Sequence, residues 1–357
     1  MPNNLQMYHK TLCQLCQWLP QERITRLRNM ALLMIGLQMS GAIHLPQIAR
    51  KWPLAGKLPS LTNRVRRFLN NERVKVRQWY EPLAKELVKR FGGREIRLVI
   101  DCTKVGFSYR MMMIGIAYKK RTLPLTWSIH KGSKGHVTVV AQLKLLRCVQ
   151  RLLPSRAKVV VLADAGFESV HLMSWLRRQG WAFVIRQNGR TQVRWQGQAW
   201  IKLNQLVIKQ GETRTIGWVR VTATHDVGWF YLVLHWAQGE DDPWYLLSNL
   251  ADTRLIIRRY KLRMWIEEMF GDMKGHGFDL EATHLDDEDR IARLVLAVCL
   301  TFVWVISLGS WLVKRGFRHY IDHKSRRDKS YFRLGWDWIE RCLRLNSPVP
   351  IQFALYF

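Results

Sequence analysis

The most informative pattern in the sequence places one acidic residue among a phenol and two cations. The run RRYKLRMWIEEMFGDMKGHG contains four such residues, separated by 3, 4 and 7 positions, namely Tyr260, Arg263, Glu267 and Lys274. At about 100° per residue, a helix places them on one face within an arc of roughly 60°. Such a face suits a grip on a phosphodiester while the carboxylate ligates a metal ion. The alternative is a solvated charged face with an i, i+4 ion pair.

Two further carboxylates follow apolar runs of the kind that form buried strands. Asp101 follows REIRLVI and Asp164 follows KVVVLA, and each is predicted to stand where its strand stops. The carboxyl ends of neighbouring strands meet at one edge of an open sheet, so the two carboxylates are expected to converge. Each one alone could instead cap a turn or a helix. As a pair, completed by Glu267, they predict a site for a hard cation.

The charge of the chain points to a polyanionic partner. Its 357 residues include 57 Lys or Arg and 27 Asp or Glu, so the formal net charge is 57 − 27 = +30. A disordered polyelectrolyte is excluded, because 48% of the residues are hydrophobic and 17 are Trp. Nucleic acid is the first partner expected, and an anionic membrane surface is the second. At this length two or three structural units are expected.

A run of 20 uncharged residues, from Leu294 to Val313, is long enough to span a bilayer. No second run of this kind is present, and the positive charge is spread along the whole chain instead of flanking this segment. We therefore predict a buried core helix and no membrane association. A basic membrane protein anchored here is the alternative.

The six cysteines are scattered, and no signal-peptide pattern is evident, so free thiols in a reducing compartment are expected. Cys13 and Cys16, with His9, fall on one helical face and could form half of a zinc site. No second ligand pair with suitable spacing follows. A buried helical stripe is the preferred interpretation.

The N-terminal region, residues 1–93, is predicted to be helical. Short helices, a turn and an Arg-rich last segment, SLTNRVRRFLNN, are typical of helix-turn-helix contact with DNA. Three arginines of this segment are the predicted DNA ligands, namely Arg64, Arg66 and Arg67. The alternative is that they only form a solvated face.

Strand patterns begin near Arg94 and define an α/β protein. Residues 94–189 predict the order βββαβαβ, in which three antiparallel strands precede alternating helices and parallel strands. This is the order of a ribonuclease H-like sheet. Residues 190–250 alternate polar and apolar residues and predict a β-rich insertion. Residues 251–320 return to helices as the second part of the core, and residues 321–357 form a basic C-terminal segment.

These motifs together resemble a known family. The spacing of Tyr, Arg, Glu and Lys is similar to the signature of DDE transposases of the insertion-sequence-four family, which are bacterial cut-and-paste enzymes. The segments IDCTKV and ADAGF resemble the strand contexts of that family's first two catalytic aspartates. The order of segments also agrees, and the resemblance covers nearly the whole chain, although the N-terminal and C-terminal segments match only in general character.

The resemblance implies that Asp101, Asp164 and Glu267 bind two magnesium ions, for which manganese substitutes. These ions would activate water or a DNA 3′-hydroxyl and stabilise the leaving oxygen in hydrolysis and strand transfer. Three residues are implied to contact phosphates near the cleaved transposon end, namely Tyr260, Arg263 and Lys274. The partners implied are double-stranded DNA, both transposon ends and target, and a second copy of the chain in a synaptic homodimer.

Members of this family often hold a flipped base on a Trp of the β-rich insertion. Four tryptophans are candidates here, namely Trp218, Trp229, Trp236 and Trp244, although packing within the insertion is the preferred role for any one of them. A DNA-binding protein with a decayed nuclease fold is the remaining alternative function. The presence of all three acids and of the Tyr-Arg-Glu-Lys set counts against it.

Overall fold

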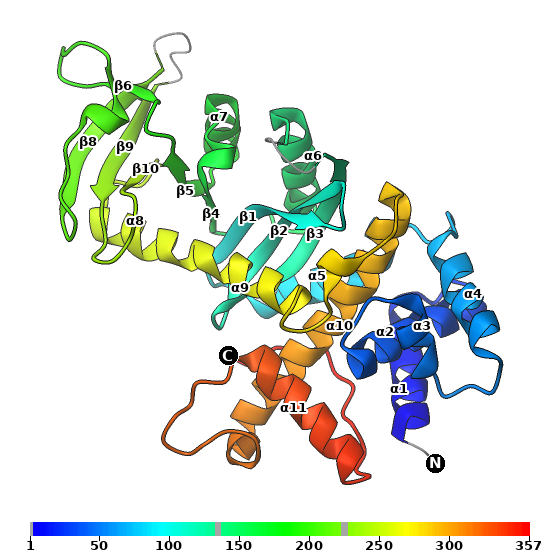
Figure 1. Ribbon diagram of the computed structural model, residues 1–357. Coiled ribbons are helices and arrows are strands. Elements are labelled where there is room, and N and C mark those ends of the chain that lie inside the picture. Colours follow the sequence, from blue (N-terminus) through cyan, green and yellow to red (C-terminus); the bar gives the residue numbers. More distant parts are fainter. Residues whose placement is uncertain (1–2, 133–136, 223–227) are drawn as a thin grey trace.

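The N-terminal part of the protein is helical, as predicted. The computed structural model describes residues 3–132, 137–222 and 228–357. Its first elements are five helices, which lie beside the long helix α10 (Figure 1): α1 (Asn3–Trp18), α2 (Ile24–Ser40), α3 (Leu45–Arg50), α4 (Leu58–Leu69) and α5 (Val76–Arg90). Proline at the start of α3 and of α4 favours these starts, because proline is pre-set for the first helical turn.

A single mixed sheet of ten strands follows. Its first five strands interleave with two helices in the predicted order βββαβαβ. They are β1 (Ile96–Val105), β2 (Tyr109–Tyr118), β3 (Arg121–Lys131), α6 (Val139–Gln150), β4 (Val159–Ala163), α7 (Val170–Arg178) and β5 (Ala182–Gln187). The spatial order begins β3-β2-β1-β4-β5; β1 to β3 pair antiparallel, whereas β1, β4 and β5 pair parallel.

The remaining strands extend this same sheet. They are β6 (Gln192–Arg194), β7 (Ile201–Lys202), β8 (Thr213–Val221), β9 (Trp229–His235) and β10 (Trp244–Ser248). β10 pairs antiparallel with β5, and β9, β8, β6 and β7 continue outward. The strands predicted within residues 190–250 therefore form, and they project to one side of the molecule (Figure 1).

Helices cover the two sides of the central strands. α6 and α7 lie on one side, whereas α8 (Thr253–Tyr260) and α9 (Met264–Met273) run almost end to end across the other (Figure 1). A short 3₁₀ turn, Lys261–Arg263, joins α8 to α9. Apolar residues of α9, including Ile266 and Phe270, are buried and anchor this helix to the sheet.

The apolar run predicted to be a core helix is α10 (Glu288–Lys314). It is the one helix within the described residues that is long and apolar enough to cross a membrane, but 94% of its apolar window is buried inside the protein. Its second basic residue, Arg293, is 5% exposed and donates to the carbonyl of Leu69 at the end of α4. The interpretation as a buried core helix is confirmed.

The C-terminal segment, which the sequence left unplaced, packs on α10. Helix α11 (Tyr331–Arg344) crosses α10 with no side chain between the backbones at two glycines. A Cβ added at Gly309 would lie 1.9 Å from the carbonyl oxygen of Tyr331, and one added at Gly335 would lie 1.9 Å from that of Val305. Beyond α11, the carbonyl of Pro350 accepts from the Trp304 indole at 3.1 Å.

This close crossing gives a stability prediction. Gly335→Ala is expected to lower the free energy of unfolding by about 3 kcal/mol, because the obstructing atom belongs to helical backbone and cannot move aside as a side chain would. Gly275→Ala is the control, since nothing lies within 4 Å of a Cβ at that position. Denaturant unfolding of the three proteins measures the effect. Equal midpoints for Gly335→Ala and the control would show that the helices do not pack this closely.

Candidate active site

Asp101 and Asp164 come together through the parallel pairing of β1 with β4. The paired residues run from Ile96↔Val159 to Ile100↔Ala163, and in each segment the aspartate is the next residue along the chain. Asp164 follows the end of β4, as predicted. The prediction that β1 ends at Asp101 was wrong: β1 continues to Val105 because it keeps its antiparallel partner β2 after the pairing with β4 has stopped.

The backbone orients both aspartates. One oxygen of Asp101, Oδ1, accepts from the N–H of Cys102 at 2.7 Å, and Oδ1 of Asp164 accepts from the N–H of Gly166 at 2.9 Å. The second oxygen of each carboxylate, Oδ2, is thereby left to face Arg263, in the turn before α9. Asp101 is 7% exposed, whereas the side chain of Asp164 is 35% exposed.

The segment from α8 to α9 brings Arg263 and Glu267 to these two acids. Arg263 is the last residue of the 3₁₀ turn, and Glu267 lies one helical turn later in the first turn of α9. The predicted single helix face is only partly right. Lys274 is the C-cap of α9 with non-helical φ −99° and ψ −132°, so it leaves that face. Glycines at 271, 275 and 277 weaken the helix at this end.

The guanidinium of Arg263 stands among all three carboxylates. Its Nη2 lies 2.9 Å from Oδ2 of Asp101 and 3.5 Å from Oδ2 of Asp164. Its Nη1 donates to Oε1 of Glu267. The three acids predicted from the sequence therefore converge, but on an arginine that was assigned to DNA. Only the i, i+4 spacing of Arg263 and Glu267 signalled part of this contact.

Burial and crowding shift the ionisation of this cluster. The net pKa of Asp101 is raised to about 6, and burial is the main cause. The charge of Arg263 opposes this rise, whereas the neighbouring Asp164 and Glu267 add to it. Burial lowers the pKa of Arg263, but the charge of Asp101, then of Glu267, more than offsets this and leaves its pKa raised. The guanidinium is therefore charged, and one cation is shared by three acids that repel one another.

A partly buried ion-pair network fixes α9 to the sheet, and no pattern in the sequence predicted it. Arg121, the first residue of β3, pairs through Nε with Oδ2 of Asp272 and at 3.0 Å through Nη1 with Oε2 of Glu268. Asp272 and Arg121 are both nearly buried. The network holds the helix that carries Glu267 but does not contact the acid cluster.

Asp272 gives a pH prediction. Burial raises its pKa to about 6 and Arg121 lowers it, so the net value lies above the ordinary 3.8. The folded protein then binds this proton more tightly than the unfolded chain. Its contribution to stability is complete below about pH 4 and is lost as the pH rises through about 6. Relative to Asp272→Asn, the parent should therefore lose about 2 to 3 kcal/mol of unfolding free energy between those limits.

Urea unfolding at several pH values measures this difference. The control is Asp241→Asn, which changes an exposed acid in the connection between β9 and β10. Its curve should run parallel to that of the parent. If the Asp272→Asn curve also runs parallel to the parent, the carboxyl does not titrate in this range.

Tyr260 is buried beneath the site. It is 3% exposed, its ring lies 4.9 Å from that of Trp244 with the planes at 68°, and burial raises its pKa to about 12. Trp244 packs within the fold, whereas Trp218 and Trp229 are 46% and 45% exposed. Trp236 is intermediate and donates to the carbonyl of Glu240 at 2.8 Å.

The other predicted DNA ligands lie apart from the acid cluster. Lys274 pairs with Glu281 at 2.7 Å. On α4, Arg66 and Arg67 are exposed, whereas Arg64 is half-buried, donates to Asn29 at 2.7 Å and stands over the ring of Trp52. The exposed side of α4 lines a shallow hollow with Ser60, Asn63, Arg66, Arg67 and Asn70.

A cavity of about 410 Å³ opens directly beside the acid cluster. Asp164 and Arg263 of the cluster line this cavity, together with Ala165, Arg186, Gln187, Asn188, Gly189, Asn204, Asp242, Pro243 and Tyr245. Arg186 lies near the end of β5, which runs parallel to β4. The last paired residues are Ala163 and Ile185, so Arg186 on β5 is level with Asp164. The sequence analysis did not single out Arg186, although its place near a strand end is the same signal that identified the aspartates.

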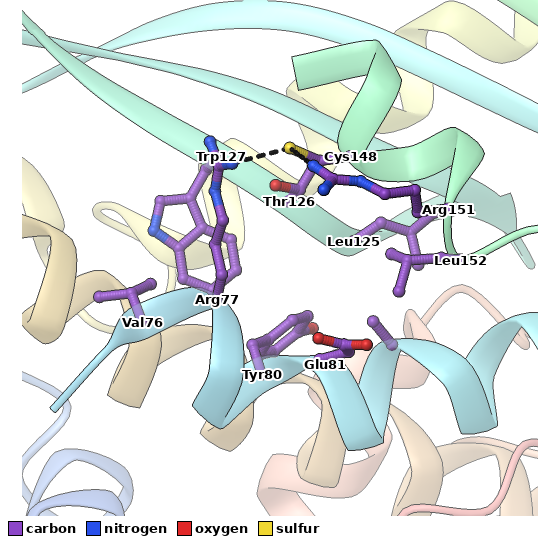
Figure 2. A pocket seen from close by; sticks show the side chains of 11 residues that line it. Val76, Arg77, Tyr80, Glu81, Leu125, Thr126, Trp127, Cys148, Arg151 and Leu152 are labelled. Atoms are coloured by element: carbon purple, nitrogen blue, oxygen red, sulfur yellow. Dashed lines mark hydrogen bonds between the residues drawn. The ribbon is translucent and has the colours of Figure 1, made fainter. Parts of the chain in front are cut away.

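A second cavity, of about 310 Å³, lies at the free edge of β3 between α5 and α6 (Figure 2). The guanidinium groups of Arg77 and Arg151 both donate to Sγ of Cys148, at 2.8 and 3.5 Å. Both arginines are exposed, so water can satisfy their remaining N–H groups. No residue of the acid cluster lines this cavity.

The acid cluster has the donor set of a hard divalent cation. All its ligating atoms are carboxylate oxygens, and three carboxylates against one guanidinium leave a formal charge of −3 + 1 = −2. Within the described residues, no three His, Cys, Asp or Glu side chains are arranged for direct metal ligation. The carboxylates of Asp101, Asp164 and Glu267 suit a divalent ion by their chemistry, but in this arrangement their oxygens contact the guanidinium of Arg263. The zinc half-site considered at Cys13 likewise finds no partner among these residues.

Comparison with known proteins identifies the family of this chain. No curated protein matches the sequence. A cryo-electron-microscopy structure of the piggyBac transposase synaptic complex with hairpin DNA aligns at a TM-score of 0.46 and 9% identity, covering 98% of this chain and 80% of that one. The family model of the transposase DDE domain matches residues 93–304, more than half of the chain. The chain therefore belongs to the family of proteins with a transposase DDE domain.

Proposed function

We propose that this protein is a cut-and-paste DNA transposase of the insertion-sequence-four family, which binds the terminal inverted repeats of its element and catalyses metal-dependent hydrolysis and strand transfer. The observation that carries the proposal is the convergence of Asp101, Asp164 and Glu267, from β1, the end of β4 and α9, on one guanidinium. Family membership supports DNA transposition as the reaction. The strand order β3-β2-β1-β4-β5 supports a ribonuclease H-like core.

The three acids are proposed as the catalytic and metal-binding residues, with magnesium as the cofactor and manganese able to substitute. The bound ions would activate the attacking water or 3′-hydroxyl and stabilise the leaving oxygen. The chain positions the ligands for this role. Backbone N–H groups hold one oxygen of Asp101 and of Asp164, and the pair of Arg121 with Asp272 fixes α9, which carries Glu267.

Several cations are proposed to hold the DNA. Arg66 and Arg67 extend from α4 into solvent and suit contact with phosphates or base edges. Arg64 positions α4 through Asn29 and contacts DNA only if it releases that bond. Near the acids, Arg263 and Lys274 would contact phosphates at the cleaved end, and each must leave an acidic partner to do so. Tyr260, which is buried, would follow Arg263 in this rearrangement.

The proposed units follow the chain. Residues 1–93 bind DNA, residues 94–189 and 251–320 form the catalytic core, and residues 190–250 form the β-rich insertion. Residues 321–357 brace α10 through α11. Because two transposon ends must be held together, we propose a homodimer in the synaptic complex. The bacterial cytoplasm, at the nucleoid, is the proposed location.

A cleavage assay tests this function. A plasmid carrying the terminal repeats that flank the coding region is incubated with the protein and magnesium, and the matched plasmid lacks the repeats. We expect nicks at the repeat ends of the first plasmid only, and none with EDTA. Tight binding of the repeats without any metal-dependent cleavage would instead support a non-catalytic DNA-binding protein.

A further inference from the structure

Each of the three carboxylates in the acid cluster directs one oxygen at the guanidinium of Arg263. Asp101 and Asp164 each use Oδ1 on a backbone N–H, and each directs Oδ2 at the same nitrogen, Nη2 of Arg263. Glu267 takes the other terminal nitrogen. The guanidinium thus occupies the position that a metal ion would share among these three ligands.

This arrangement leaves one N–H group of Arg263 without an acceptor and part of the negative charge of the acids without a counter-charge. The side chain of Arg263 is 13% exposed, and its Nε is buried without a hydrogen-bond acceptor. The cluster keeps a formal charge of −2 after Arg263 is counted, because three acids face one cation. In a partly buried site, both the unpaired N–H and the excess negative charge are unfavourable. Replacing the single charge of the Arg263 guanidinium by the double charge of a divalent cation would therefore stabilise the cluster.

An alternative partner for the guanidinium has room beside it. The cavity of about 410 Å³ is lined by two cations, Arg263 and Arg186, as well as by Asp164 and Asp242. A phosphodiester entering there would offer Arg263 a planar pair of oxygens, which guanidinium groups bind bidentately. It would also bring a negative charge that draws Arg263 away from the acids.

We propose that Arg263 is an exchangeable internal counter-cation. It holds the three carboxylates together in the free protein, and a DNA phosphate in the adjoining cavity draws it off, so that divalent ions bind tightly only after DNA. This inference rests on the proposed function, since it concerns the same acids. Its consequence is that metal and DNA bind cooperatively, each raising the affinity for the other by the same factor.

The direct test measures Mn²⁺ binding without DNA, by the electron paramagnetic resonance signal of free Mn²⁺. Arg263→Ala is expected to bind Mn²⁺ about tenfold more tightly than the parent, because the competing cation is gone. The matched control is Arg259→Ala, which removes a similarly buried arginine of α8 that pairs with Glu95 and not with the cluster. It should bind Mn²⁺ as the parent does. Equal or weaker binding by Arg263→Ala overturns the proposal.

A second measurement does not depend on the folding of a variant. The Mn²⁺ affinity of the parent protein is measured alone and with a saturating short DNA duplex that carries the repeat end. We expect a rise of about tenfold with DNA and a matching rise in DNA affinity with Mn²⁺. Independent binding of the two overturns the inference.

The two levels of proposal fail differently. If the parent binds Mn²⁺ equally well with and without DNA, and Glu267→Gln abolishes that binding, the metal site stands and only the role of Arg263 falls. If neither the parent nor Arg263→Ala binds Mn²⁺ under any condition, both the metal-dependent function and this inference are wrong.

Discussion

Glu267→Gln is expected to lower the rate of DNA cleavage by about a thousandfold or more while changing DNA affinity by less than about twofold. A shared metal ligand contributes several kcal/mol to the transition state, and each 1.4 kcal/mol corresponds to about tenfold in rate. The amide keeps the size of the side chain and can still accept from Arg263, so the fold and the DNA surface are preserved. Asp101→Asn and Asp164→Asn are expected to behave alike, because all three acids meet at the same guanidinium.

The neighbouring residue supplies the control. Glu268 is the next acid on α9, and its side chain turns the other way, to Arg121. Glu268→Gln therefore removes the same charge from the same helix without touching the cluster. Single-turnover cleavage of a repeat-end duplex and its binding by gel shift give the two readouts. If Glu267→Gln and Glu268→Gln cleave equally well, Glu267 is not the third acid.

DNA affinity is expected to fall by about 10³ to 10⁵ between 50 and 200 mM salt, as for proteins that neutralise about six to ten phosphates. The net charge of +30 supplies this attraction, and each phosphate contact releases counterions when it forms. Arg66→Ala and Arg67→Ala should each reduce the slope of log affinity against log salt by about 0.9, since both side chains are exposed on α4.

The control for this prediction removes a positive charge that is already paired. Lys85 on α5 lies 2.6 Å from Glu81 and is exposed. Lys85→Ala changes the net charge as much as Arg67→Ala does, but the salt slope should stay at the value of the parent. Fluorescence anisotropy of a labelled repeat duplex at several salt concentrations gives the slopes. Equal slopes for all variants would place the DNA contact away from α4.

Much of the fold could be predicted because its signals are local. The order βββαβαβ follows from apolar runs whose period is set by strand or helix geometry, and each predicted element of residues 94–189 is present. The buried state of α10 follows from the even distribution of charge elsewhere in the chain. The C-terminal segment could not be placed in this way. Its close crossing with α10 depends on two glycines, Gly309 and Gly335. Their role is visible only when the backbones of the two helices are seen in contact.

In the candidate site, too, local features could be predicted from the sequence and long-range features could not. The acids Asp101 and Asp164 could be paired from sequence because parallel strands carry their ends to one edge. The extent of β1 beyond Asp101 could not, because it depends on a different neighbour, β2. The position of Lys274 was wrong for a related reason, since helix periodicity says which residues share a face but not where the helix ends.

The sequence by itself determined which residues could carry the chemistry: three acids in apolar or helical contexts within a strongly basic chain. The tertiary structure alone decided what stands between them. Arg263 and Asp101 are separated by 162 residues, and their contact depends on how the 3₁₀ turn before α9 lies against β1 and β4. Local periodicity carries no information about such a long-range approach of side chains. The sequence therefore showed that Arg263 is a cation near Glu267, but not that it is the counter-ion of all three acids.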